Sequence, residues 1–194
     1  MGARRANTRT GHRSRPLAGA QARDLAGAAI AKVLATPCLY TELTPGPADL
    51  DLVQSAVLCL VNKKRAQNGE APLLVNGDLE RAAEAHSREM VAADYFEHVS
   101  PSGETPSDRI RSAGYIPNAT VGYVVGENLA WGTLELSTPQ AIAEAWFASP
   151  EHLANILEGQ YRETGIGVVP SVPESLAEGQ PGAIYTEDFG TILR

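Results

Sequence analysis

Apolar residues recur at helical spacing along two stretches in the first half of the chain. The first stretch begins near Leu50, and Asn68-Gly69 can end it as a C-terminal cap. The second begins at Asn76, whose side chain can cap a helix. The spacing predicts two amphipathic helices, each with one face turned toward a core. Their apolar faces consist of Leu50, Val53, Val57, Leu60 and Val61 in the first, and of Leu79, Ala82, Ala83, His86 and Met90 in the second.

Three further helix starts have a capping residue followed by proline at the first helical position. They are Thr105-Pro106, Thr138-Pro139 and Ser149-Pro150. The third start places His152 in the first turn of a new helical segment, which we expect to end at Gly159.

Extended structure is predicted where apolar runs lie between turn residues. Residues 73–75 form a short extended piece, and residues 121–125 suit a strand. Two later runs, 164–169 and 183–189, are separated by a connection rich in proline and glycine. This pattern predicts an antiparallel hairpin with a long connection.

Length and composition suit one domain with an extension, or at most two small domains. The chain has 194 residues, of which 43% are hydrophobic but 6% aromatic, so we expect an aliphatic core rich in alanine. Mean hydropathy is −0.16, and no stretch approaches the apolar length of a membrane span. We expect residues 1–36 to be a basic tail, disordered or a degenerate signal segment, and residues 37–194 to form the domain.

Charge is distributed unevenly along the chain. The first 23 residues contain six arginines and no acidic residue, whereas the remainder carries all 23 acidic residues and ten basic ones. An acidic domain argues against nucleic-acid binding by the domain itself. The tail is interpreted as a solvated or targeting segment, and an arm that binds nucleic acid or an anionic membrane is the alternative. Residues 25–31 resemble the apolar part of a secretion signal, but Asp24 and Lys32 interrupt it, so export stays open.

The two cysteines, Cys38 and Cys59, leave two interpretations open. Cys59 lies within the apolar pattern of the first helix, which favours a buried thiol. Cys38 follows Pro37 in a connecting segment, from which a disulfide could tie that segment to the helix. Such a bridge would contribute about 3 kcal/mol to stability and would imply an oxidising compartment.

The candidate chemistry centres on Glu127, which lies in an apolar run between Gly126 and Gly132. A carboxylate enclosed by apolar surface needs a partner, because burying an unpaired charge is expensive. The candidate partners are His98 before it and His152 after it. Two imidazoles and a carboxylate are the ligand types of a zinc site with room for water. The spacing does not show that they meet, so three separate, hydrogen-bonded residues are the alternative.

Other polar and aromatic residues are weaker candidates. His86 lies on an apolar helix face, where a histidine satisfied within the core is expected rather than a ligand. Ser100 and Ser102 could supply a nucleophile, but neither a Gly-x-Ser-x-Gly elbow nor an orienting aspartate accompanies them. Trp131 and Trp146 are interpreted as core or cavity wall.

Seven short motifs follow one another over most of the chain, from about Leu52 to Phe189. Each is weak alone, but their order resembles that of the CAP superfamily of cysteine-rich secretory, antigen 5 and pathogenesis-related proteins. The similarity is strongest to its short, bacterial SCP-like members. The motifs are Leu60-Val61-Asn62-Lys63-Lys64-Arg65 with Pro72-Leu73, Leu79-Glu80-Arg81-Ala82-Ala83, Phe96-Glu97-His98-Val99-Ser100-Pro101, Gly126-Glu127-Asn128-Leu129-Ala130, Ala145-Trp146-Phe147-Ala148-Ser149-Pro150-Glu151-His152, Ile166-Gly167-Val168 and Tyr185-Thr186-Glu187-Asp188-Phe189-Gly190.

The resemblance implies an α/β (α+β) fold of the CAP type, an α-β-α sandwich with a small antiparallel sheet between helical layers. It also implies a shallow central cavity lined by two histidines and two glutamates, which hold a divalent metal in some members. His98, Glu127 and His152 match three of these positions. Ser149 stands at the fourth, where many eukaryotic members have glutamate, and the nearby Glu151 is the residue that could substitute.

The resemblance implies a secreted or cell-surface binding module with a cavity lined by histidine and glutamate. We expect no enzymatic activity, and a lipid, a sterol or a cell-envelope component as the ligand. The alternative is a hydrolase that depends on a divalent metal such as zinc, which His98, Glu127 and His152 would hold to activate water. The oligomeric state is open.

Overall fold

Four strands form one sheet in the order β1-β3-β4-β2. The computed structural model describes residues 16–193, with side chains from residue 23 onward. The strand β4 pairs antiparallel with both β2 and β3, whereas the two-residue β1 runs parallel to β3. The sheet is therefore antiparallel, as expected, except at one edge. The strands are β1 (Leu74–Val75), β2 (Gly122–Thr133), β3 (Glu163–Val169) and β4 (Gly182–Leu193).

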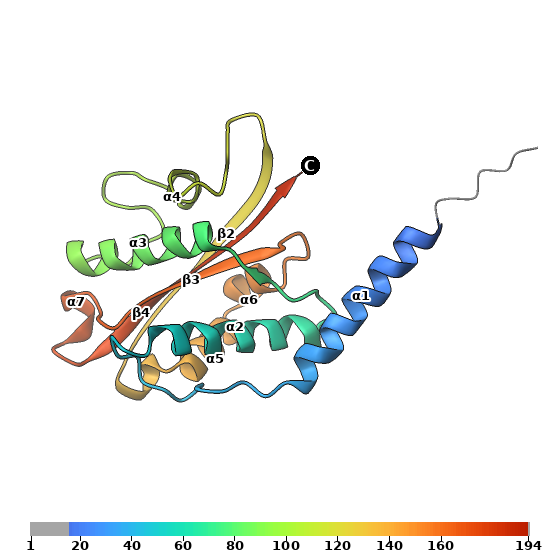
Figure 1. Cartoon of the computed structure of the whole chain (residues 1–194). Coiled ribbons are helices and arrows are strands. Elements are labelled where there is room, and N and C mark those ends of the chain that lie inside the picture. The colour runs from blue at the N-terminus through green and yellow to red at the C-terminus, as the bar shows by residue number, and fades with distance from the viewer. Residues whose placement is uncertain (1–15, 194) are drawn as a thin grey trace, which may run out of the picture.

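Helices cover both faces of this sheet, which confirms the α-β-α arrangement (Figure 1). On one face, a cluster that includes Val57 and Trp146 packs against Tyr185 and Phe189 of β4. On the other face, Leu79 and the neighbouring apolar residues pack against the start of β2. The first layer consists of α2 (Leu50–Gln67), α5 (Pro139–Ala148) and α6 (Pro150–Ile156), and the second of α3 (Gly77–Ala93) and α4 (Pro106–Ser112).

The predicted helix starts are confirmed in position, and three of the four caps, at Asn76, Thr105 and Thr138, form as expected. Asn76 accepts hydrogen bonds from the backbone N–H groups of Asp78 and Leu79. Thr105 and Asp108 form a complete capping box at the start of α4. Ser149 stands at the capping position of α6, but its side chain makes no cap bond in the described part of the chain. That hydroxyl is engaged elsewhere, with His152.

The helix α3 lies directly on the backbone of β3. A Cβ atom added at Gly165 would lie 2.0 Å from the backbone nitrogen of Glu80, and one at Gly167 would lie 2.3 Å from the carbonyl carbon of Ala83. Helix and strand can approach this closely because both positions are glycine. The close approach places the buried face of α3, including His86, against the middle of the sheet.

The first described element, α1 (Pro16–Ala35), extends away from the sheet and its helical layers (Figure 1). Residues 16–35 of the expected tail form this helix, in which alanine, the best helix former, is frequent. Whether this segment is a signal stays a prediction. Residues 1–15, which carry most of the arginines of the tail, lie outside the described residues. Among the described residues, no helix is both long and apolar enough to cross a membrane.

A disulfide between Cys38 and Cys59 settles the open question about the cysteines. It ties the segment after α1 to the middle of α2, with the two Cα atoms 5.6 Å apart. A bridge that closes a loop of this size stabilises the fold by about 3 kcal/mol in the chain-entropy account.

Two consecutive acids of β4, Glu187 and Asp188, are completely buried on opposite faces of the sheet. Glu187 accepts a hydrogen bond of 3.2 Å from the hydroxyl of Thr164. Burial raises the pKa of Glu187 to about 8, against the opposing effects of Thr164 and Arg65. The unfolded chain releases this proton above a pH of about 4.5, whereas the folded protein keeps it up to about 8. The free energy of unfolding should therefore decrease as the pH rises between these two values.

We predict that Glu187→Gln removes part of this decrease. The amide cannot ionise, so the slope of unfolding free energy against pH should become shallower by up to about 1.4 kcal/mol per pH unit between pH 5 and 8. Urea denaturation at several pH values measures the slope. An unchanged slope in a variant that folds would show that Glu187 is ionised in the native protein.

Candidate functional site

The carboxylate of Glu127 lies buried in the middle of β2, on the face of the sheet that α3 covers. Its side chain is 1% exposed. The register of β2 and β4 places Asp188 directly opposite. Because paired residues of antiparallel strands point to the same face, two buried acids share this position. Such a pair needs compensation from neighbouring donors or cations.

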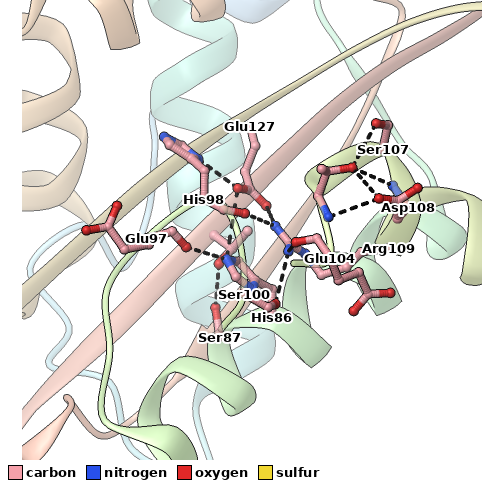
Figure 2. Close-up of polar contacts among 12 residues, drawn as sticks. His86, Ser87, Glu97, His98, Ser100, Glu104, Ser107, Asp108, Arg109 and Glu127 are labelled. Carbon is pink, nitrogen blue, oxygen red and sulfur yellow. Dashed lines mark hydrogen bonds and ion pairs between the residues drawn. The ribbon is translucent and has the colours of Figure 1, made fainter. Parts of the chain in front are cut away.

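Two donors compensate Glu127, one on each carboxylate oxygen (Figure 2). The imidazole of His98 bonds through Nδ1 to Oε1 at 2.7 Å. The guanidinium of Arg109 donates through Nη2 to Oε2 at 2.8 Å. The His98 side chain is 52% exposed, whereas that of Arg109 is 4% exposed. The acid therefore joins a half-exposed imidazole to a buried cation.

Arg109 also holds the loop that carries His98. It donates hydrogen bonds to the backbone carbonyl oxygens of His98 at 2.8 Å and Glu104 at 3.1 Å. The capping box at Thr105 fixes the start of α4, and Arg109 lies in the last turn of this seven-residue helix. The short helix thus places the guanidinium of Arg109 beside the loop, where it bonds both to the loop backbone and to Glu127.

His86 confirms the expectation of a core histidine, but it also lies beside the acid. Its side chain is fully buried. Its Nε2 lies 3.0 Å from the carbonyl oxygen of Glu97 and 4.0 Å from Oε1 of Glu127. Burial lowers the pKa of His86 below its ordinary value, so we take it as neutral at pH 7. We refer to Glu127, His98, Arg109 and His86 together as the Glu127 cluster.

His152 lies near this cluster without bonding to Glu127 in the described structure. Its Nδ1 lies 2.7 Å from the hydroxyl oxygen of Ser149, and Glu151 is exposed at the surface. Ser149, not Glu151, therefore orients this second imidazole. Two side-chain amides tie α6 to β2. Asn128 donates to the carbonyl oxygen of His152 at 3.2 Å, and Asn155 donates to that of Glu127 at 3.0 Å.

The surroundings shift the pKa values of the two imidazoles in opposite directions. The hydrogen bond to Glu127 raises the pKa of His98. Burial lowers the pKa of His152, and the charge of His98 lowers it further, so the two rings influence each other. Burial alone would raise the pKa of Glu127, but His98 and Arg109 outweigh it and keep the carboxyl ionised at neutral pH. Burial, and then the charge of Glu127, raise the pKa of Asp188 well above its usual range.

The arrangement does not fit a divalent metal held by His98, Glu127 and His152. Both oxygens of Glu127 are bonded, one of them to a cation that would repel a metal ion. His98 and His152 alone leave two imidazole nitrogens, fewer than the three protein ligands of a catalytic zinc site. Among the described residues, no group of three histidine, cysteine, aspartate or glutamate side chains is arranged to hold a metal.

Three residues of this region escaped the sequence analysis: Arg109, Asn155 and Asp188. Arg109 follows the capping box at Thr105, a local signal that places the helix but does not show where its arginine points. Asp188 lies within an apolar strand pattern, the same signal that drew attention to Glu127. Asn155 carries no such signal, because a single amide on a short helix is common on protein surfaces.

The comparison with protein families shows where the chain belongs. The profile of the Cysteine-rich secretory protein family, CAP, matches residues 58–175, more than half of the chain. The uncharacterized protein YkwD of Bacillus subtilis is 31% identical over 159 residues, which make up 81% of this chain and 54% of that protein. The uncharacterized membrane protein YlbC of the same organism is 30% identical over 115 residues, 59% of this chain and 31% of YlbC. The chain thus spans about half or less of the length of these relatives.

Solved structures show the same fold. An extracellular protein of Bacillus anthracis that contains an SCP domain superimposes with a TM-score of 0.54 at 25% identity, over 75% of this chain and 44% of that one. An outer surface protein of Borrelia burgdorferi superimposes with a TM-score of 0.57 at 17% identity, over 76% of this chain and 95% of that one. At 17% identity, this second likeness concerns the fold alone.

We predict that Glu127→Gln lowers the pKa of His98, because the charge that favours the imidazolium is removed. Titration of the imidazole resonances by NMR measures the pKa. The resonance of His152, which bonds to Ser149 instead, should move much less and is an internal control. Equal pKa values for His98 in the variant and the wild type would show that the two groups do not interact in solution.

Proposed function

Because the chain belongs to the cysteine-rich secretory protein (CAP) family, we propose that it is a secreted or cell-surface binding module whose ligand contacts the solvent-facing side of the Glu127 cluster and His152. The ligand is a lipid, a sterol or a component of the cell envelope, and the protein binds it without chemical change. A function of this kind needs a rigid polar surface rather than a nucleophile.

One observation carries this proposal: the polar groups behind the two imidazoles are already bonded within the protein. Both oxygens of Glu127 and the Nδ1 atoms of His98 and His152 have protein partners. The Nε2 edge of His98, on a half-exposed side chain, is then available to a ligand. Groups held in place before binding lose little entropy when the ligand arrives, which favours recognition.

A location outside the cytoplasm is supported by the disulfide and by one relative. Disulfides form and persist mainly in oxidising compartments, and Cys38 is bonded to Cys59. The Bacillus anthracis relative, at 25% identity, is described as an extracellular protein. These observations favour export.

The test is a binding screen of the full chain against extracted lipids, sterols and cell-wall fragments. For a ligand found in this way, we predict that His98→Ala weakens binding by about tenfold or more, as expected for a residue at the centre of an interface. Arg88→Ala is the matched control, because Arg88 is exposed on α3 and pairs only with the nearby Glu84 among the interactions described for it.

Calorimetry gives the dissociation constants, and circular dichroism checks that each variant folds. Binding to none of these classes would remove the proposal of an envelope or lipid ligand. A ligand that binds equally well to His98→Ala and to the wild type would place the binding surface elsewhere on the molecule.

A further inference from the structure

The strand β2 lies at one edge of the sheet and, among residues 16–193, pairs only with β4 (Figure 1). In an antiparallel ladder, a residue turns its backbone N–H and C=O either both toward the paired strand or both away from it. The carbonyl oxygen of Gly190, in β4, accepts a hydrogen bond from the N–H of Arg162, on the β3 side. Gly190 therefore turns away from its β2 partner, Val125, and Val125 directs its own N–H and C=O outward.

Side chains of α5 and α6 close the second half of this edge. By the same alternation, Glu127 and Leu129 also turn their backbone groups outward. Asn155 donates a hydrogen bond to the carbonyl oxygen of Glu127 at 3.0 Å, and Nε1 of Trp146 donates to that of Leu129 at 3.0 Å. Another strand cannot use these carbonyl oxygens without displacing two side chains.

The first half of the edge is open. Tyr123 and Val125 turn their N–H and C=O groups outward, and no hydrogen bond to these groups forms among the described residues. The run Val121-Gly122-Tyr123-Val124-Val125 contains no lysine, proline or acidic residue, and its register with β4 is continuous from Gly122 onward, without a bulge. Native sheets normally block their edges with such devices, because an open edge accepts another strand.

The opposite edge of the sheet shows this protection. The strand β1 covers the start of β3, and Gln54 donates a hydrogen bond to the carbonyl oxygen of Ile166 at 2.7 Å just beyond it. Ile166 and Val168 are also buried. The start of β2 is therefore the part of the two edges that is left without protection in the described structure.

The distribution of charge indicates which strand this edge accepts. Residues 112–126 and the adjacent residues 189–193 contain no charged side chain, although the chain as a whole carries a net charge of −7. Arg111 lies over the ring of Tyr123, and its charge is paired with Asp108. Two copies can meet at an uncharged edge without opposing like charges, which an acidic surface elsewhere would impose. A charged peptide would find no complementary charge on this strand.

We propose that β2 pairs antiparallel with β2 of a second copy of this chain, so that two four-stranded sheets join into one. With a two-fold axis at Val124, Tyr123 of each copy lies opposite Val125 of the other. Each copy then supplies two N–H donors and two carbonyl acceptors to its partner. A contact of this size is typical of weak association. The inference goes beyond the ligand proposed above and does not depend on it.

Sedimentation velocity of the full chain, at concentrations up to about 1 mM, measures the oligomeric state. We expect a monomer at low concentration and a dimer at high concentration. Tyr123→Pro removes an outward N–H without breaking a bond to β4, and Val124→Lys places two positive charges opposite each other on the axis. Each should raise the dissociation constant about tenfold or more. Val75→Lys is the matched control, because it adds the same charge at the opposite edge of the sheet and should leave the dissociation constant unchanged.

Hydrogen exchange identifies the interface directly. The amide protons of Tyr123 and Val125 should exchange more slowly as the concentration rises, whereas that of Val124, which bonds to β4, should not change. Circular dichroism checks that each variant folds. A wild-type protein that stays monomeric up to about 1 mM would overturn the proposal and leave a strand of another protein as the occupant. A dimer in which exchange at Tyr123 and Val125 is unaffected would also overturn it, and neither of these two results depends on the variants.

Discussion

The pairing of Glu127 with Arg109 and His98 is the interaction on which the rest of the candidate site depends. A buried carboxylate is tolerated when charged donors satisfy it, and here each oxygen has one. The partners come from different elements, since Arg109 belongs to α4 and His98 to the loop after α3. One side chain of β2 thereby ties both segments to the sheet. The geometry of the exposed imidazole follows from that pairing.

The sheet itself contributes to this arrangement by burying polar groups on both faces. Alternation along β4 sends Glu187 toward α2 and Asp188 toward α3, so adjacent acids experience different surroundings. Glu187 has Thr164 and the distant charge of Arg65, whereas Asp188 faces Glu127 and Arg109. Buried acids that stay protonated decrease stability at neutral pH. Because β4 carries two such acids, it lowers the stability of the protein at neutral pH while placing polar groups in the interior.

The sequence was sufficient to predict the helix starts, because a cap and a proline act locally. The positions of Asn76 and Thr105 followed from this chemistry, and the order of the family motifs indicated the α-β-α arrangement. The sequence does not show which residue a side chain contacts when that residue is distant along the chain. Arg109 reaches Glu127 only because a loop and a strand meet in space. Serine is a common capping residue, yet the hydroxyl of Ser149 bonds to His152 instead. The backbone N–H groups of the helix and the imidazole compete for the same hydroxyl.

The most direct test of this account is a double-mutant cycle between Glu127 and Arg109, with the free energy of unfolding as the measured quantity. A buried, hydrogen-bonded charge pair should show a coupling energy of about 2 kcal/mol or more, because each single change leaves the other charge buried without its partner. Glu127→Gln and Arg109→Met, alone and together, make up the cycle. Additive effects of the two changes would contradict the account, since they would mean that the acid does not depend on the arginine.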